Sequence, residues 1–273
     1  MSGSMSATAR RRASATTRRG LLAALALALP AVRARAEAGP LVAAAADLAF
    51  ALEEIAGLFR ATGGGPVRLV FGSSGNVARQ IRQGAPFELF LSADEEFVLE
   101  LARDGLTRDQ GLPYAVGRIV LLVPHGSPLA ADGTLADLAR ALGDGRLGRF
   151  AIANPEHAPY GRRAEEALRH RGLWEAIRPK LVLGENVGQA AQFVTSGNAQ
   201  GGIVAWSLAL APQVAARAAH APIPEAWHAP LRQRMALTQR AGPAAERFLA
   251  FLLGPEARAV FARSGFLAPT DGG

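Results

Sequence analysis

The sequence of 273 residues contains no cysteine. The protein therefore uses neither disulfides nor thiol chemistry, and its stability must come from the burial of apolar groups. A lipid anchor carried by an exported cysteine is excluded for the same reason. The sequence also lacks residues spaced as metal ligands. The five histidines are scattered along the chain and are interpreted as loop residues. We therefore expect no bound metal ion other than the centre of a bound oxyanion, and no cofactor.

A membrane-spanning run is missing near the start of the chain. The apolar run 21–32 has about a dozen residues, fewer than the ~20 that cross a bilayer. Arginines precede this run, and small residues at 34–36 and 36–38 fit a cleavage site, a pattern typical of a secretory signal. We predict that residues 1–38 are a cleaved signal peptide and that the protein is periplasmic. The pair Arg18-Arg19 suggests twin-arginine export, with the general secretory route as the alternative.

The excess of positive charge is concentrated in this predicted leader. The whole chain has a formal net charge of +7, but residues 1–38 contain seven arginines and one glutamate, so the remainder carries only +1. A nucleic-acid interface needs a stripe of basic residues, commonly with interleaved aromatics, and none is found after the leader. Nucleic acid is therefore excluded as a partner. The remaining length suits one large or two modest domains.

Apolar runs alternate with amphipathic segments from Leu41 onward. Strands are predicted at 41–45, 67–71, 87–91, 118–123, 150–153, 181–183 and 202–205, and a further apolar run lies at 235–238. One helix is predicted to begin at Asp47. Further helices are predicted at 76–83, 95–103, 135–142, 161–171, 188–195, 244–253 and 255–263. This alternation predicts an α/β fold built on parallel sheets.

Four loops that follow predicted strands are rich in small and polar residues. They lie at 44–47, 71–76, 154–161 and 184–187. In open α/β sheets, ligands bind beyond the carboxyl ends of the strands, where helix N-termini begin. Backbone N–H groups and hydroxyls that converge there, with no Lys or Arg among them, predict a site for a small anion held by neutral dipoles. About five to seven such hydrogen bonds at ~1.5 kcal/mol each correspond to micromolar affinity or better before ordering costs.

Two other interpretations of these loops were weighed. Each loop taken singly is also ordinary helix-capping or turn chemistry, but their succession at four strand ends favours a ligand site. The stretch 72–75 is similar to the nucleophile elbow of hydrolases. That motif requires glycine at position 76, where Asn76 stands, so we reject a serine nucleophile.

With these motifs considered together, the sequence resembles the periplasmic molybdate-binding proteins, the soluble receptors of molybdate importers. The matching stretches are 44–48, 71–81, 84–94, 154–159, 184–187 and 202–204. They occur in the expected order, and the resemblance covers residues 41 to 268, nearly everything after the leader.

The resemblance implies the two-lobe type II periplasmic-binding-protein fold, an α/β fold in which each lobe is a mostly parallel sheet flanked by helices and the ligand cleft lies between the lobes. Residues 39–120 plus 231–273 would form lobe 1 and residues 121–230 lobe 2, with crossings near 118–124 and 222–234. The implied function is binding without catalysis, in which lobe closure presents molybdate or tungstate to an inner-membrane ABC permease with its cytoplasmic ATPase. We expect a monomer.

The resemblance also implies a set of ligand-binding residues. They are Asp47, Ser73, Ser74, Tyr160, Asn186 and Val187. Ser74 would donate its hydroxyl and N–H, and Val187 and Tyr160 would donate backbone N–H groups. The family commonly has a tyrosine at position 205, where this chain has Ala205, and Tyr160 could supply a replacement hydroxyl.

Asp47 is a second departure, because the family usually has a serine there that donates to the anion. A carboxylate about 4 Å from a dianion would cost about 8 kcal/mol at an effective dielectric of about 20. Three hypotheses avoid this cost. Asp47 could cap its helix and face away, it could share a proton with a hydrogen-bearing oxyanion, or it could coordinate the central metal directly.

Rival function classes use the same fold. Porphobilinogen deaminase needs a cysteine to hold its cofactor, and this chain has none. DNA-binding sensors carry a helix-turn-helix domain, whereas the residues before Leu41 are predicted to be a signal. Among receptors, the alternative is a different ligand, such as a sulfate-like or protonated oxyanion or a small organic acid, because Asp47 and Ala205 depart from the family pattern.

Overall fold

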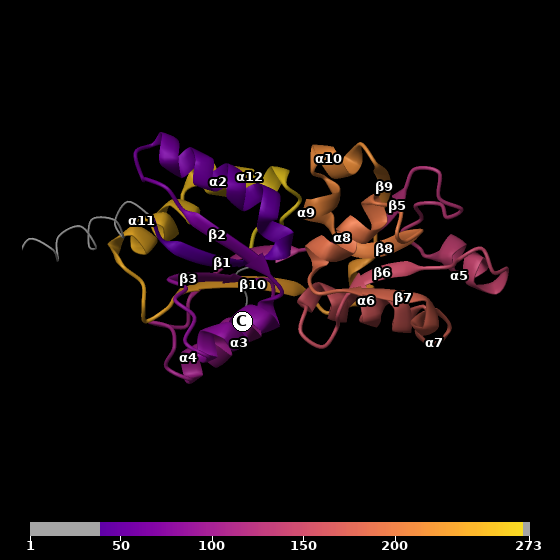
Figure 1. Ribbon diagram of the computed structural model, residues 1–273, viewed down its shortest axis with the longest axis horizontal. Coiled ribbons are helices and arrows are strands. Elements are labelled where there is room, and N and C mark those ends of the chain that lie inside the picture. Colours follow the sequence, from indigo (N-terminus) through magenta and orange to yellow (C-terminus); the bar gives the residue numbers. More distant parts are fainter. Residues whose placement is uncertain (1–38, 270–273) are drawn as a thin grey trace, which may run out of the picture. The chain divides into compact units, whose positions relative to one another are not determined.

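The computed structural model describes residues 39–269, so the predicted signal peptide lies outside the described residues. Two five-stranded sheets organise this part of the chain (Figure 1). The first contains β1 (Leu41–Ala45), β2 (Arg68–Gly72), β3 (Leu89–Ser92), β4 (Leu112–Gly117) and β10 (Leu231–Leu237), in the order β2-β1-β3-β10-β4. The second contains β5 (Ile119–Pro124), β6 (Phe150–Ala153), β7 (Leu181–Gly184), β8 (Gly201–Ala205) and β9 (Ala218–Pro222), in the order β7-β6-β8-β5-β9.

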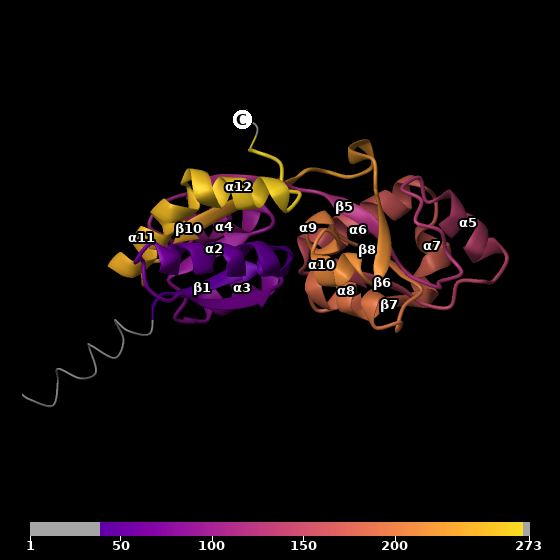
Figure 2. The ribbon, with the colours of Figure 1, turned by 90° about the horizontal axis from the view of Figure 1, so that it is seen from above.

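Helices cover both faces of each sheet. The first sheet, with its helices, is the first lobe, and contains η1 (Ala46–Leu48), α2 (Ala49–Ala61), α3 (Ser74–Arg82), α4 (Glu95–Arg103), α11 (Pro243–Leu252) and α12 (Pro255–Arg263). The second lobe contains α5 (Ala136–Gly143), α6 (Pro159–His170), α7 (Trp174–Ile177), η2 (Arg178–Lys180), α8 (Val187–Thr195), α9 (Trp206–Ala209), α10 (Pro212–Ala215) and η3 (Glu225–Trp227). Helices α2 and α12 pack together on one face of the first sheet, and α3 and α4 lie on the other (Figures 1 and 2).

The two-lobe α/β fold is confirmed, and both sheets are mixed. In the first sheet β1 pairs in parallel with β2 and β3, while β10 is antiparallel to β3 and β4. The second sheet repeats this arrangement, with β6 parallel to β7 and β8, and β5 antiparallel to β8 and β9. The antiparallel strands are those that enter a sheet directly after the chain has crossed from the other one.

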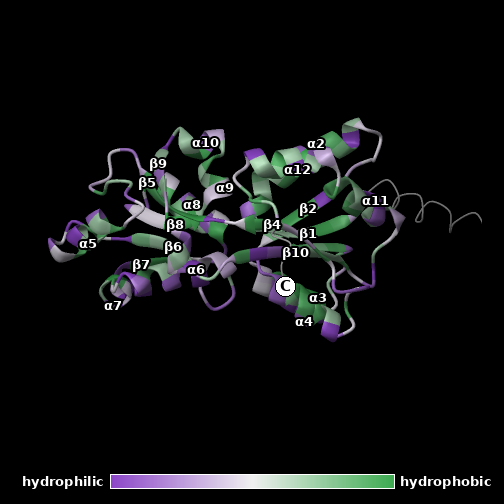
Figure 3. Ribbon diagram, turned by 180° about the vertical axis from the view of Figure 1, so that it is seen from behind, coloured by the Kyte–Doolittle hydropathy of each residue, from purple (hydrophilic) through white to green (hydrophobic). Residues whose placement is uncertain are grey.

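Two edge strands, β4 and β9, were not predicted from the sequence. Both contain proline and begin or end with exposed residues, so they lack the continuous apolar run that marks a buried strand. The central strands have that run, and Figure 3 shows their apolar character. Helix α2 packs on the first sheet through Leu52, Ile55 and Phe59, which share one face of the helix and are buried.

The chain crosses between the sheets twice. Arg118 alone separates β4 from β5, and residues 223–230 connect β9 to β10. The division into residues 39–120 plus 231–273 and residues 121–230 stays a prediction, although strand β5 pairs within the second sheet from Ile119 onward. No helix within residues 39–269 is both long enough and apolar enough to cross a membrane.

Candidate functional site

A small cavity lies where loops of both lobes meet. Its lining residues lie at or after the carboxyl ends of strands β1, β2, β3, β6 and β7. They are Ala45, Ala46, Asp47, Gly72, Ser73, Ser74, Ala93, Ala158, Pro159, Tyr160 and Val187. The space open to the centre of a water molecule is about 10 Å³, roughly what one water needs. In this structure the cavity therefore has room for about one water-sized group.

Three helix N-termini are directed at this cavity. Helix α3 begins at Ser74, α6 at Pro159 and α8 at Val187, and all three residues line the space. The N–H groups of a first helical turn have no acceptor within the helix, and the helix dipole places partial positive charge there. The cavity is therefore suited to an anion although it contains no Lys or Arg.

Ser74 is placed as a donor. Its side chain is fully buried, and its Oγ accepts the N–H of Ala93 at 3.0 Å, which leaves the hydroxyl proton free to donate. Ser73 also lines the cavity, but its Oγ shares a hydrogen bond of 2.9 Å with Nδ1 of His157. Asn186 lies outside the small cavity and caps helix α8, because its Oδ1 accepts the N–H of Gln189 at 3.0 Å.

Asp47 belongs to a buried hydrogen-bond network that sequence analysis missed. The residue is 1% exposed, and its Oδ2 accepts from the Tyr160 hydroxyl at 2.9 Å and from Nε2 of Gln233 at 2.7 Å. The Tyr114 hydroxyl donates to the other end of the Gln233 amide at 2.7 Å, and the Ser207 hydroxyl donates to the Asp47 carbonyl at 2.8 Å. The second carboxylate oxygen of Asp47, Oδ1, is buried and has no hydrogen-bond partner among residues 39–269.

Burial controls the ionisation of this network. Desolvation raises the pKa of Asp47 to about 6, although the hydrogen bonds from Gln233 and Tyr160 oppose the shift. Desolvation also raises the pKa of Tyr160 and of Tyr114 well above the usual value, so both phenols stay neutral donors. The carboxylate is thus the one group of the network that changes charge near neutral pH.

Two expectations about individual side chains are corrected. Asp47 is not the N-cap of its helix, since it lies within η1, whose N-cap is Ala45 without a side-chain bond. The Tyr160 hydroxyl points to Asp47, so it is engaged within the protein rather than free to replace the tyrosine hydroxyl lacking at Ala205. Gly117 makes room for this hydroxyl, because a Cβ there would lie 2.3 Å from it.

The sequence pattern around Gln233 indicates that this residue is buried. In β10 the residues Leu231, Gln233 and Met235 alternate with arginines, and all three are fully buried. The period of two places this glutamine on the inner face of a strand, where a polar side chain needs a partner.

The lobes make direct contacts around the cavity. The N–H of Gly75 donates to the carbonyl of His157 at 3.0 Å, and the Asn76 amide donates to Glu185. Glycine is required at position 75, because a Cβ there would lie 2.6 Å from the His157 carbonyl oxygen. These contacts connect the start of α3 to two loops of the second lobe.

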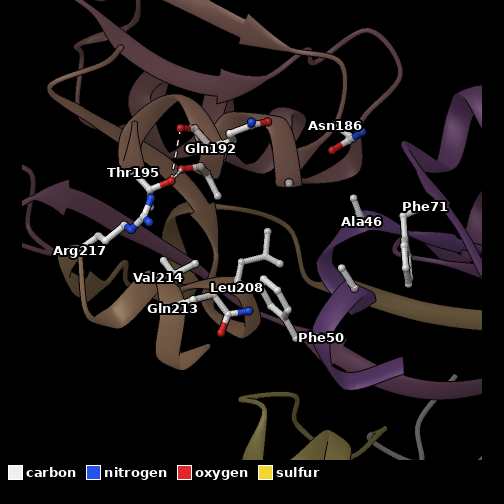
Figure 4. Close-up of a pocket in the computed structure, with 13 residues that line it drawn as sticks. Ala46, Phe50, Phe71, Asn186, Gln192, Thr195, Leu208, Gln213, Val214 and Arg217 are labelled. Carbon is white, nitrogen blue, oxygen red and sulfur yellow. Dashed lines mark hydrogen bonds between the residues drawn. The ribbon is translucent and has the colours of Figure 1, made fainter. Parts of the chain in front are cut away.

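A larger pocket lies beside the anion cavity and shares Ala46 with it (Figure 4). Its volume is about 400 Å³, and its apolar side chains include Phe50, Leu208 and Val214. Arg217 is its single charged lining residue and is exposed to solvent. Its described lining includes no residue from the N-termini of α3 and α6, so the smaller cavity is better suited to a small oxyanion.

Neutral donors from two lobes, gathered around one small cavity, define a two-lobed binding protein for a small anion. Among residues 39–269 there is no cluster of three or more His, Cys, Asp and Glu residues that could hold a metal ion.

Comparison with known proteins agrees with this class. Residues 40–267 match the family model described as bacterial extracellular solute-binding protein. The chain is 36% identical over 245 residues to the molybdate-binding protein ModA of Rhodobacter capsulatus, covering 88% of this chain and 91% of that protein. It is 35% identical to ModA of Escherichia coli K12, covering 82% and 87%. The periplasmic molybdate-binding protein of Azotobacter vinelandii superposes with a TM-score of 0.74 at 31% identity, covering 85% and 100%.

The chain therefore belongs to the bacterial extracellular solute-binding protein family. Its members bind a solute outside the cytoplasm as components of transporters, so this protein is not an enzyme.

Proposed function

We propose that this protein captures molybdate, or the isosteric tungstate, and delivers it to an inner-membrane ABC permease with its cytoplasmic ATPase. One observation carries the proposal: the N-termini of α3, α6 and α8 and the Ser74 side chain line the same small cavity. A fully ionised oxyanion has no proton to donate and needs donors only. The names of the relatives support molybdate among such anions.

The proposed ligand contacts come from both lobes. Ser74 donates its hydroxyl and N–H from the first lobe, and Val187 and Tyr160 donate backbone N–H groups from the second. Ser73 and Asp47 complete the lining of the cavity, and Asn186 holds the first turn of α8 in place. Because each lobe supplies donors, the anion favours the closed arrangement of the lobes.

We also propose that residues 1–38 are removed during export and that the mature protein is a periplasmic monomer. Mass spectrometry of the protein from the periplasmic fraction should give an N-terminus near residue 39. Replacing Arg18 and Arg19 by lysine should block export if the twin-arginine route is used and leave it unchanged if the general route is used.

The proposal is tested by calorimetry and thermal unfolding of residues 39–273 with molybdate, tungstate, sulfate, phosphate and small carboxylates. At a hundredfold excess over its dissociation constant, the correct anion should raise the free energy of unfolding by about 2.7 kcal/mol. We expect this for molybdate and tungstate, measured at about pH 5.5 and again at neutral pH. Binding of sulfate or a carboxylate but not molybdate would replace the proposed ligand, and binding of none would contradict an anion receptor.

Replacing Ser74 by alanine removes a buried donor from the cavity. A hydrogen bond to a charged group contributes about 1.5–3 kcal/mol, so we expect molybdate to bind about 10- to 100-fold more weakly, as measured by calorimetry. Ser196→Ala is the matched control, because Ser196 is exposed at the far end of α8. Equal affinities of the two variants would show that Ser74 does not contact the anion.

A further inference from the structure

The two oxygens of the Asp47 carboxylate differ in their hydrogen bonding. Oδ2 accepts two hydrogen bonds, from Tyr160 and Gln233, whereas Oδ1 is buried and has no partner in the described part of the chain. Asp47 lines the anion cavity and is 1% exposed, so water does not solvate the free oxygen. A buried carboxylate oxygen without a partner in the protein can be satisfied by a donor on a ligand or by a proton of its own.

An ionised Asp47 is incompatible with a bound dianion. Both would occupy the same small cavity, and the repulsion between them in a desolvated site is large. The neutral acid reverses the interaction, because its Oδ1–H becomes a donor. Protonation on Oδ2 would instead disrupt the hydrogen bonds from Tyr160 and Gln233.

We propose that Asp47 holds the oxyanion as the neutral carboxylic acid, with Oδ1–H donating to the anion, so that each anion is captured together with one proton. This inference rests on the proposed function and adds its regulation by pH. The proton comes from solvent and binds Oδ1, and no bond of the oxyanion is made or broken.

The surroundings of Asp47 support this assignment. The side chains facing its carboxylate and backbone are Tyr160 from α6, Gln233 from β10 and Ser207 from α9, with Tyr114 from β4 behind Gln233. All are neutral, so within the described residues no ion pair holds the carboxylate in its charged form. Burial already brings the pKa of Asp47 to about 6, and an adjacent dianion raises it further.

His157 is another ionisable group near the cavity. It contacts Ser73, and its Nε2 lies 3.6 Å from Glu185, which is exposed at the rim. A positive charge on His157 would also favour an anion, so an experiment must separate the two residues.

The test is calorimetry of residues 39–273 with molybdate between about pH 5.5 and 8.5, in two buffers of different ionisation enthalpy. Above about pH 6 we expect the affinity to fall about tenfold per pH unit and the proton uptake to approach one per anion. Asp47→Asn should show no proton uptake and a flat affinity profile, because the amide is a permanent neutral donor. Asp47→Ser serves the same purpose if the amide variant does not fold.

The outcomes are distinct. If wild-type protein binds molybdate with constant affinity and no proton uptake, the inference is overturned while the proposed function stands. If His157→Asn removes the pH dependence and Asp47→Asn keeps it, the proton belongs to His157 and the inference is again overturned. Tighter binding of phosphate than of molybdate above about pH 7 would mean that an ionised Asp47 accepts a proton from the ligand. Absence of binding to any anion at any pH would contradict both proposals.

Discussion

At the scale of single residues, the buried Asp47 carboxylate also affects the stability of the free protein. Burial raises its pKa from 3.8 to about 6, and each unit corresponds to about 1.4 kcal/mol. The folded state therefore binds this proton more tightly than the unfolded state does. The resulting stability is complete below pH 3.8 and is lost as the pH rises through about 6. An ionised Asp47 thus destabilises the fold above that pH by roughly 3 kcal/mol.

Asp47→Asn removes this dependence on pH. As the pH is raised from ~4 to ~8, we expect the variant to become more stable relative to wild type. Its free energy of unfolding should gain roughly 3 kcal/mol on that of wild type. Urea denaturation without added oxyanions measures the two free energies of unfolding. Any destabilisation by the amide that does not depend on pH cancels when the two pH values are compared.

Asp137 provides a control of opposite sign. The N–H of Ala130 donates to its carboxylate and lowers its pKa, so its contribution is present at neutral pH and lost as the pH falls through its lowered pKa. Asp137→Asn should therefore lose stability relative to wild type at neutral pH and approach it in acid. The same pH trend for both variants would contradict the assigned pKa shifts.

At the scale of elements, the start of α3 has two tasks. Ser74 faces the anion cavity, while the next residue, Gly75, donates its N–H to the second lobe. One helical turn therefore connects ligand binding to lobe contact. The absence of a side chain at Gly75 is what allows the approach of the His157 backbone.

Gly75→Ala should disturb that approach. Its Cβ would lie 2.6 Å from the His157 carbonyl oxygen, so the lobes must separate and lose the hydrogen bond. Overpacking costs about 1–3 kcal/mol, and we expect molybdate affinity to fall by about tenfold or more.

Gly57→Ala is the matched control, because a Cβ on this α2 residue meets nothing within 4 Å. It should leave the affinity unchanged and stabilise the helix by about 0.5–1 kcal/mol. Unchanged anion affinity in Gly75→Ala would show that the lobes do not need this contact to bind the ligand.

At the scale of the whole molecule, binding depends on how the two lobes meet. Besides the contacts around the cavity, Arg163 of α6 pairs with Asp94, which caps α4 of the first lobe, at 3.5 Å. Both side chains are largely shielded from solvent, with 12% and 17% exposed. The apparent affinity is proportional to the fraction of molecules in the binding-competent arrangement.

Arg163→Gln should therefore accelerate release of the anion. Losing a largely buried pair between the lobes is expected to weaken molybdate binding by about three- to tenfold, mainly through the dissociation rate measured by stopped flow. Arg169→Gln on the same helix removes a pair with Glu165 that lies within one lobe. It should leave the association and dissociation rates of molybdate unchanged. Equal dissociation rates in both variants would contradict a role of this pair in closure.

The central strands and most helices were predicted because their periodicity is local. Strand β1 is an uninterrupted apolar run, and α2 repeats its buried residues on one face. The site loops were predicted for a related reason, since small residues after a strand and before a helix indicate an exposed N-terminus. The edge strands β4 and β9 gave no such signal, because each contains a proline and has exposed residues at one end.

By itself, the sequence determined the α/β fold, the positions of the strand-end loops and the absence of Lys and Arg from them, because each depends on near neighbours in the chain. Only the tertiary structure decided the environment of Asp47. Its partners Tyr160 and Gln233 are 113 and 186 residues away, and only the packing of two lobes on one another brings them together. That packing, by removing water from one carboxylate, makes its charge dependent on pH.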